Sequence, residues 1–127
     1  MPRFSVRSVK NLAGVHPDLV AVMNAAIKDS PLDFAIPEGL RTLERQQKLV
    51  AAGASSTLNS RHLTGHAVDV VVFVDGQVRW DWPLYDTLAV HIKKCAAELK
   101  IPIEWGGDWK RFRDGPHYQL PWERYPK

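Results

Sequence analysis

The segment Ala67–Val74 (AVDVVVFV) constrains the fold of this chain more than any other part of its sequence. A strand with this sequence is apolar on both faces, which is typical of a strand buried at the centre of a sheet. Asp75-Gly76 follows at once, and this dipeptide favours a tight hairpin turn into a return strand over residues 77–82. The sequence therefore predicts a sheet built around residues 67–74.

Helical and strand patterns flank this hairpin on both sides. Apolar residues at helical spacing predict three helices, and short alternating segments predict three further strands; the helices cover residues 16–30, 42–52 and 83–100, and the strands residues 33–39, 101–105 and 117–120. Thr42 is the expected N-cap of the second helix, and Gly53 is expected to end it. Helices interleaved with antiparallel strands predict an α+β fold with a small antiparallel sheet and about three helices.

The length of 127 residues predicts a single domain over residues 1–127. The one cysteine excludes an internal disulfide, a Cys-rich zinc finger and an iron–sulfur cluster. No apolar run approaches the ~18 residues that span a bilayer, and the basic N-terminus lacks the apolar segment of a secretory signal. We therefore expect a protein that is made in the cytoplasm and has no integral membrane segment. We also expect it to be a monomer.

The net charge is +3, which favours anionic polymers without distinguishing one from another. The sequence contains no zinc-finger spacing, no aromatic RNA-binding motif and no uninterrupted basic run. We therefore expect no nucleic-acid partner.

Asp69 is the charged residue within the apolar strand, and an ionised carboxylate there is costly unless a cation or hydrogen-bond donors pair with it. One interpretation is a structural salt bridge to an arginine. His62 lies seven residues earlier, on the segment that enters the strand, and Gly65 lets the backbone turn between the two. A histidine and a carboxylate that converge in this way favour the second interpretation, a metal site.

Asp114-Gly115-Pro116-His117 opens the last predicted strand. If His117 is a third ligand beside His62 and Asp69, the set has three protein ligands, which leaves room for the water of a catalytic zinc. Asp114 could then act on that water as a general base, although Asp-Gly-Pro is also a turn signal in its own right.

Arg41 lies at the junction of a predicted strand and a predicted helix. An arginine so placed can hold a substrate carboxylate or a developing oxyanion. Taken alone, it is better explained as a surface charge.

Several motifs resemble the VanY/VanX-type D-Ala-D-Ala metallopeptidase family. Residues 60–69 (SRHLTGHAVD) match its Ser-x-His-x-x-Gly-x-Ala-x-Asp metal motif, and Arg41 with Gln46 matches the Arg-(x)4-Gln element of its preceding helix. Residues 105–109 (WGGDW) and 114–119 (DGPHYQ) are similar to the L-alanyl-D-glutamate endopeptidase branch, which includes phage endolysins and bacterial wall hydrolases. The resemblance covers nearly the whole chain.

The resemblance implies a hedgehog/DD-peptidase-like fold that binds one Zn2+. His62, Asp69 and His117 would be its metal ligands, and Asp114 would be the catalytic base. Arg41 would polarise the scissile carbonyl or stabilise the oxyanion. Many carboxypeptidase relatives have Glu-x-x-His where this chain has Asp114-x-x-His117, so the endopeptidase branch is the better match.

The implied function is an endolysin-type peptidoglycan hydrolase that cleaves the L-Ala–D-Glu bond of the stem peptide with a zinc-activated water. A D,D- or L,D-carboxypeptidase of the same fold and a non-catalytic zinc-containing wall-binding domain are the alternatives. With bacterial peptidoglycan as its partner, we expect the protein to be made in the host cytoplasm and to act on the cell wall after the membrane is permeabilised.

Four further residues are assigned to substrate binding on the same basis, namely Gln46, Ser60, Trp105 and Trp109. For the two tryptophans, lining a peptide groove and packing in the core are equally open interpretations.

The other aromatic, histidine and cysteine residues are given structural roles. Trp80 and Trp82 are expected to pack the hairpin, and His66 to support the site without binding the metal. The core stripe of the helix over residues 83–100 is expected to consist of Leu84, Leu88, Ile92, Cys95 and Leu99.

Overall fold

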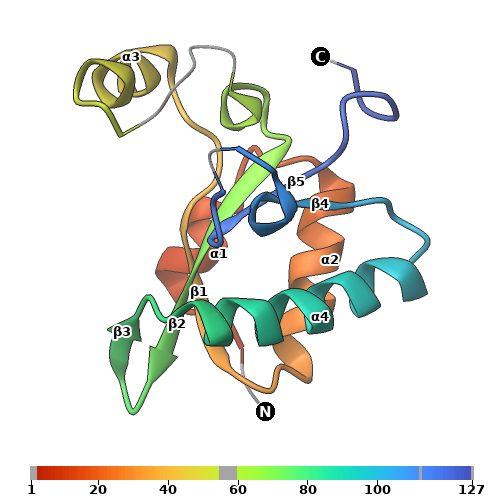
Figure 1. Ribbon diagram of the computed structural model, residues 1–127. Coiled ribbons are helices and arrows are strands. Elements are labelled where there is room, and N and C mark those ends of the chain that lie inside the picture. Colours follow the sequence, from red (N-terminus) through yellow and green to blue (C-terminus); the bar gives the residue numbers. More distant parts are fainter. Residues whose placement is uncertain (1–2, 55–59, 112, 127) are drawn as a thin grey trace.

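The apolar strand that the sequence predicts runs through the centre of the protein as β2 (Ala67–Val74; Figure 1). Val68, Val70 and Val72 have no exposed surface, because other elements cover the strand. The structure is a computed structural model, and it describes residues 3–54, 60–111 and 113–126.

β2 pairs antiparallel with β1 (Asp33–Glu38) and with β5 (His117–Gln119), and β4 (Glu104–Trp105) pairs with β5 at the outer edge. In the part of the chain that the structure describes, these strands and the hairpin partner of β2 form a five-stranded sheet. The predicted α+β fold is confirmed.

The predicted hairpin is present but shorter than expected. Asp75 and Gly76 both have positive φ, 52° and 78°, as a type I′ turn requires. The return strand β3 (Gln77–Arg79) ends three residues before the predicted boundary. It ends there because Asp81 already serves as the N-cap residue of the next helix.

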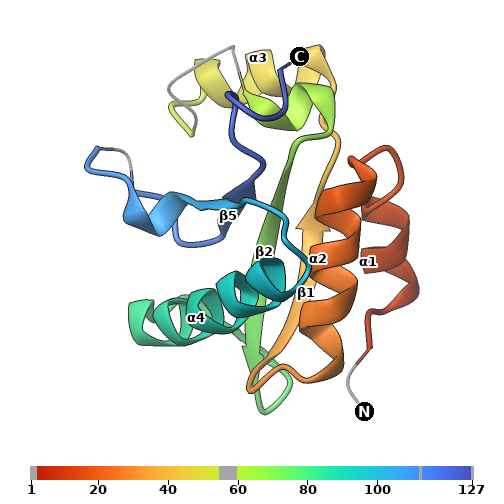
Figure 2. The ribbon, with the colours of Figure 1, turned by 90° about the vertical axis from the view of Figure 1, so that its right-hand side faces the viewer.

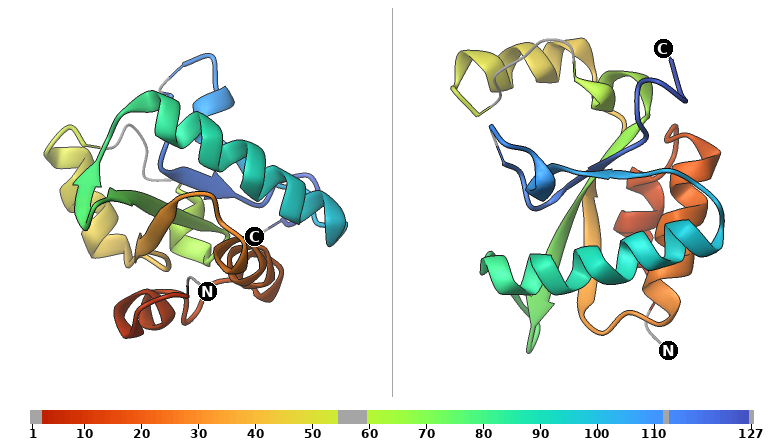
Figure 3. Two further views of the ribbon diagram at one scale, coloured as in Figure 1. Left: turned by 90° about the horizontal axis from the view of Figure 1, so that it is seen from below. Right: turned by 45° about the vertical axis from the view of Figure 1, so that its right-hand side comes forward.

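α2 (Pro17–Lys28) and α4 (Trp82–Glu98) pack against one another and share one core with the sheet (Figures 2 and 3). Burial of their apolar faces stabilises the fold by roughly 1.5–3 kcal/mol for each large side chain that is fully removed from water. Leu88 and Ile92 of α4 are fully buried as expected, but Cys95 is only partly buried and Leu99 is 43% exposed. The predicted stripe was too long, because the helix ends at Glu98 and Leu99 is its C-cap.

α1 (Val6–Asn11) lies beside β1 and was not predicted (Figure 1). Val6 and Val9 are 84% and 59% exposed, so no apolar stripe marks this helix in the sequence. Polar contacts hold it instead: the Ser8 hydroxyl accepts from the Ile36 amide at 3.0 Å, and Asn11 donates to the Ile36 carbonyl at 2.8 Å.

α3 (Leu43–Ala51) and the short 3-10 helix η1 (Arg61–Thr64) lie at the opposite end of the protein from the β2–β3 hairpin (Figure 1). The predicted N-cap is confirmed, since the Thr42 hydroxyl accepts from the Arg45 amide at 3.1 Å. These two helices flank the end of β2 at which Asp69 lies.

The expected packing of the two hairpin tryptophans is only partly observed. Trp80 is 62% exposed and Trp82 is 41% exposed, so neither is buried by the hairpin.

Within the described residues, no helix is long and apolar enough to cross a membrane.

Candidate active site

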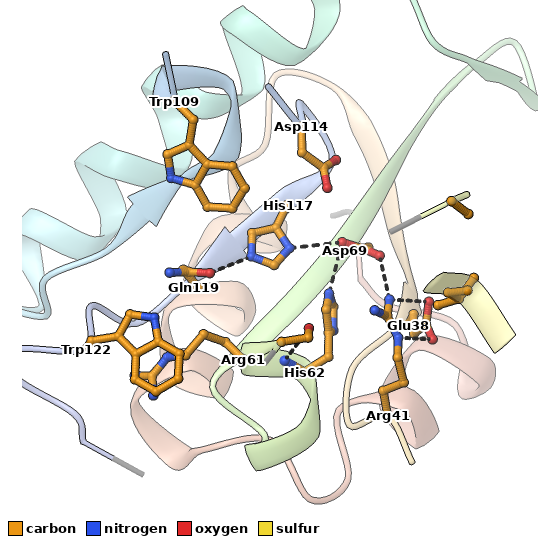
Figure 4. A pocket seen from close by; sticks show the side chains of 13 residues that line it. Glu38, Arg41, Arg61, His62, Asp69, Trp109, Asp114, His117, Gln119 and Trp122 are labelled. Atoms are coloured by element: carbon orange, nitrogen blue, oxygen red, sulfur yellow. Dashed lines mark hydrogen bonds and ion pairs between the residues drawn. The ribbon is translucent and has the colours of Figure 1, made fainter. Parts of the chain in front are cut away.

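Asp69 is the middle member of a row of side chains that crosses three strands. Its Cα is paired with that of Glu38 on β1 and with that of His117 on β5. Directly paired residues of antiparallel strands project to the same face of the sheet. His62 joins this row from η1, where Gly65 ends the helix at φ 76° and redirects the chain into β2 (Figure 4).

His62, Asp69 and His117 form a group that could hold a metal ion. His62 Nε2 lies 3.3 Å from Asp69 Oδ1, and His117 Nδ1 lies 3.5 Å from the same oxygen. The three ligand atoms all lie within 4.8 Å of one another. Two imidazole nitrogens and one carboxylate oxygen that face a common point are the donor types of a catalytic zinc site.

Hydrogen bonds on the outer side of each imidazole determine which nitrogen faces the group. His62 Nδ1 lies 2.8 Å from the Gly39 carbonyl oxygen, which can only accept, so Nδ1 carries the proton and Nε2 is free to bind a metal. His117 Nε2 lies 2.7 Å from Gln119 Oε1, and the Gln119 amide donates in turn to Glu104 at 3.0 Å. His117 therefore presents Nδ1. Such partners orient metal-binding histidines.

Arg41 is held in a fixed orientation at the other side of Asp69. Its Nε and Nη2 donate to the two carboxylate oxygens of Glu38 at 2.8 and 2.9 Å, and its Nη1 donates to Gln46 Oε1 at 2.7 Å. Its Nη2 also lies 3.6 Å from Asp69 Oδ2. The side chain is only 8% exposed, so Arg41 is not a surface charge. Asp69 thus faces both an arginine and the two histidines. The salt-bridge interpretation and the metal-site interpretation of Asp69 are therefore compatible with one another.

A cavity of about 420 Å³ opens over this group. The described residues that line it are Glu38, Arg41, Leu49, Ala54, Ser60, Arg61, His62, Asp69, Trp109, Asp114, His117, Gln119 and Trp122 (Figure 4). Its lining includes two of the residues assigned to substrate binding, Ser60 and Trp109. The other two, Gln46 and Trp105, are buried and are not among the described lining residues.

Asp114 lies across the group from His62, and its carboxylate points toward Asp69 and His117 (Figure 4). The turn that carries it is anchored to η2 (Gly106–Asp108), because the Asp114 amide donates to the Gly106 carbonyl at 3.0 Å. A Cβ at Gly106 would collide with the Asp114 carbonyl oxygen, so glycine is required for this close approach.

Trp105 supports the same turn from the core. It is only 6% exposed, and its indole Nε1 donates to the Gly115 carbonyl at 2.7 Å. Of the two interpretations left open for Trp105, the structure agrees with core packing, at a position beneath the Asp114 turn.

The two aspartates of the site have pKa values shifted in opposite directions. Burial alone would raise the pKa of Asp69, but hydrogen bonds with His117 and His62 outweigh it and hold this pKa well below its usual range. Burial raises the pKa of Asp114, and the nearby Asp69 carboxylate raises it further. A carboxyl with a raised pKa can both accept and return a proton, which suits a general base.

Three contributors to the site were not found from the sequence. Glu38 follows Pro37 at the end of a strand, three residues before Arg41. In the sequence, only its charge at that position indicates that it could pair with Arg41. Gln119 shares a strand face with His117 by the two-residue period, which could have identified it. Trp122 lies beyond the last strand, where no pattern indicates its position in the cavity wall.

His66 lies apart from the metal-ligand group, as expected. Its Nδ1 is 2.6 Å from the Thr64 hydroxyl, and its ring lies 5.5 Å from that of His16.

The fold and the site together define an α+β domain of the peptidase type. One cavity contains three side chains that could hold a metal ion, a second carboxylate, and an arginine held by hydrogen bonds. The family model of the phage L-alanyl-D-glutamate peptidase matches residues 1–120. The chain belongs to this family, and the resemblance seen in the sequence is confirmed.

Individual relatives agree with this assignment. The L-alanyl-D-glutamate peptidase of Escherichia phage T5 is 32% identical over 116 residues, which cover 88% of this chain and 85% of that protein. The crystal structure of the L-Ala D-Glu endopeptidase ChiX of Serratia marcescens superposes with a TM-score of 0.92 at 50% identity, over 99% of this chain and 96% of that one. The vancomycin resistance D,D-dipeptidase VanXYg shares the fold, with a TM-score of 0.56 at 16% identity over 84% of this chain and 50% of that one.

Proposed function

We propose that this protein is a zinc-dependent endopeptidase that hydrolyses the L-Ala–D-Glu bond of the peptidoglycan stem peptide. The observation that carries the proposal is the convergence of His62, Asp69 and His117 on one point, within the cavity that Asp114 and Arg41 also line. The L-alanyl-D-glutamate peptidase of phage T5 and the L-Ala D-Glu endopeptidase of Serratia marcescens support this choice of bond.

The donor set fits zinc. Nε2 of His62, Nδ1 of His117 and a carboxylate oxygen of Asp69 are three ligands of the types zinc prefers, and three protein ligands leave a position open for a reactant. A zinc ion held there would act as a Lewis acid and lower the pKa of a water molecule from 15.7 to about 7.

Asp114 performs the proton transfers in the proposed mechanism. Its carboxylate accepts a proton from the water whose oxygen attacks the L-Ala carbonyl carbon. As the C–N bond breaks, the same carboxyl group returns the proton to the departing D-Glu amine. A positioned group of this kind contributes about 10²–10⁴-fold to the rate.

Arg41 stabilises the negative charge that develops on the L-Ala carbonyl oxygen. Glu38 and Gln46 hold its guanidinium from two sides, so little reorganisation is needed when that charge appears. Gln46 thus acts on the substrate through Arg41. Ser60 and Trp109, which line the cavity, are proposed to contact the stem peptide directly.

We place this activity at the bacterial cell wall, where the polymer is. Synthesis in the host cytoplasm, release after membrane permeabilisation and a monomeric state all stay predictions. Fractionation of producing cells before and after permeabilisation tests the first two, and light scattering of the purified protein tests the third.

The test of the function is digestion of purified peptidoglycan by zinc-loaded protein, followed by mass spectrometry of the products. We expect new D-Glu amino termini, with L-Ala left on the glycan. Release of C-terminal D-Ala instead would establish a carboxypeptidase. Tight binding to peptidoglycan without any new amino termini would establish a wall-binding domain.

A further inference from the structure

A second, smaller cavity lies on the other side of the turn that carries Asp114. Its volume is about 160 Å³. The described residues that line it are Trp80, Trp82, Tyr85, Arg113, Asp114, Gly115 and Pro116. It is therefore dominated by aromatic side chains, and it has a guanidinium at its edge.

Two of these aromatic residues are exposed although their neighbours hold them in place. Trp80, 62% exposed, stacks parallel to Tyr85 at a centroid distance of 6.1 Å. Tyr85 is itself fixed, since its hydroxyl accepts from the Val72 amide at 3.1 Å and donates to the Arg79 carbonyl at 2.8 Å. The ring is thus pre-organised while one face stays open to solvent.

Trp82 is held in a similar way on the other side of the cavity. The Arg113 guanidinium carbon lies 4.3 Å from the centre of its ring, and Trp105 contacts it edge-on at 6.5 Å. Arg113 is oriented by a hydrogen bond from its Nε to the Gly107 carbonyl at 2.8 Å. Exposed, pre-oriented tryptophans beside a guanidinium are a surface for a ligand that has both an apolar face and polar edges.

A pyranose sugar is a ligand of this kind. The C–H bonds on one of its faces fit the electron-rich face of an aromatic ring, and its hydroxyl and amide oxygens accept hydrogen bonds from a guanidinium. An apolar peptide side chain would fill the cavity but would leave the guanidinium edge unused.

The small cavity adjoins the active-site cavity at the Asp114 turn, since Asp114 lines both. Two hydrogen bonds position the turn between them: the Pro116 carbonyl accepts from the Val70 amide at 2.9 Å, and the Gly115 carbonyl accepts from Trp105. In peptidoglycan, the L-Ala of the stem peptide is joined by an amide to the lactyl group of a muramic acid. The sugar therefore lies one residue away from the bond that is cleaved.

We propose that Trp80, Trp82 and Arg113 bind the muramic acid sugar that carries the cleaved stem peptide. This inference rests on the proposed function and adds a subsite to it. The enzyme would then prefer stem peptides that are still attached to glycan over free peptides with the same scissile bond.

The test compares two soluble substrates with the same L-Ala–D-Glu bond. In one the L-Ala amine carries the muramic acid disaccharide, and in the other it carries only an acetyl group. The measured quantity is the ratio of kcat/KM on the first substrate to kcat/KM on the second. A general loss of folding lowers both values, so the ratio isolates the sugar contact.

We expect wild-type protein to prefer the sugar-linked substrate, and Trp80→Ala or Trp82→Ala to reduce this ratio by roughly threefold to tenfold, the range typical of an aromatic contact. Arg113→Gln should reduce it as well. Val78→Ala is the matched control, since Val78 is 45% exposed on the same hairpin but does not line the cavity. It should leave the ratio unchanged.

A wild-type ratio near one that Trp80→Ala does not alter would overturn the sugar subsite and leave the proposed function intact. If wild-type protein cleaves neither substrate, the proposed function itself fails.

Discussion

Asp69 and Asp114 are the same residue type in one cavity, yet their surroundings give them opposite properties. Asp69 lies within a strand between two histidines and an arginine, which favour its charged form. Asp114 lies on a turn where burial and the charge of Asp69 disfavour ionisation. Identical side chains thus acquire different chemical properties from their environments, which supports the proposal that Asp69 binds the metal and Asp114 transfers the proton.

We expect the greatest loss of activity from replacing Asp69, the proposed metal-binding carboxylate. Asp69→Asn removes the anionic ligand, so we expect bound zinc to fall to background and activity to fall by more than the ~10⁴-fold upper range of a proton-transfer residue. Elemental analysis and turnover on purified peptidoglycan measure both quantities. Full zinc retention in a folded Asp69→Asn protein would contradict the ligand assignment.

Asp114→Asn is the matched change at the second carboxylate. Asparagine preserves the size of the side chain but cannot accept the proton of the attacking water, so we expect normal zinc content and a loss of about 10²–10⁴-fold in turnover. If turnover stays near the wild-type value, another group must be the base.

A smaller effect is expected from the residue that orients His117. Gln119→Leu removes the acceptor for His117 Nε2, and changes of this kind typically lower metal affinity by about 10–100-fold. Competition with a fluorescent zinc chelator measures this affinity. Gln47→Leu, an exposed position on α3, is the control; equal affinities for the two variants would show that the hydrogen bond does not support the metal.

The smallest effect concerns the stability of the metal-free protein as pH changes. A lowered pKa means that Asp69 contributes stability above its ordinary pKa of 3.8, and that this contribution is lost as pH falls below it. A raised pKa gives Asp114 the opposite sign: its ionisation costs stability as pH rises through its pKa in the folded protein.

We therefore compare the free energy of unfolding of each variant with that of wild type as pH rises from acid to neutral. We expect Asp114→Asn to become more stable than wild type over this range, and Asp69→Asn to become less stable than wild type. Urea unfolding of chelator-treated protein across this pH range tests the prediction. Changes of the same sign in both variants would mean that the two carboxylates are not distinguished by their surroundings.

The sequence was most informative where the pattern is local. β2 and its turn follow from continuous apolar residues and from Asp75-Gly76, and His62 and Asp69 lie within ten residues of one another. The order of pairing around β2 was not predictable, because the three residues of β5 owe their position to contacts with β2 and β4. Glu38 and Gln119 become part of the site only through that pairing.

Other failures have a different physical cause. Trp80 and Trp105 are the same residue type in similar contexts, but one is 62% exposed and the other 6% exposed. Hydrophobicity alone predicts burial for both. Only the tertiary structure shows that the core has room for Trp105 beneath the Asp114 turn, while Trp80 is left at the surface.

The brevity of β4 and β5 has a consequence for local unfolding. Two strands of two and three residues contribute few ladder hydrogen bonds, so we expect their backbone amides to be less protected than those of β2, although the side chains of β5 are buried. A metal bound by His117 together with His62 and Asp69 would tie β5 to the stable centre. Amide hydrogen exchange in residues 104–119 should then slow when zinc is added, and the reactive centre and its surrounding edge would open and close as one cooperative unit.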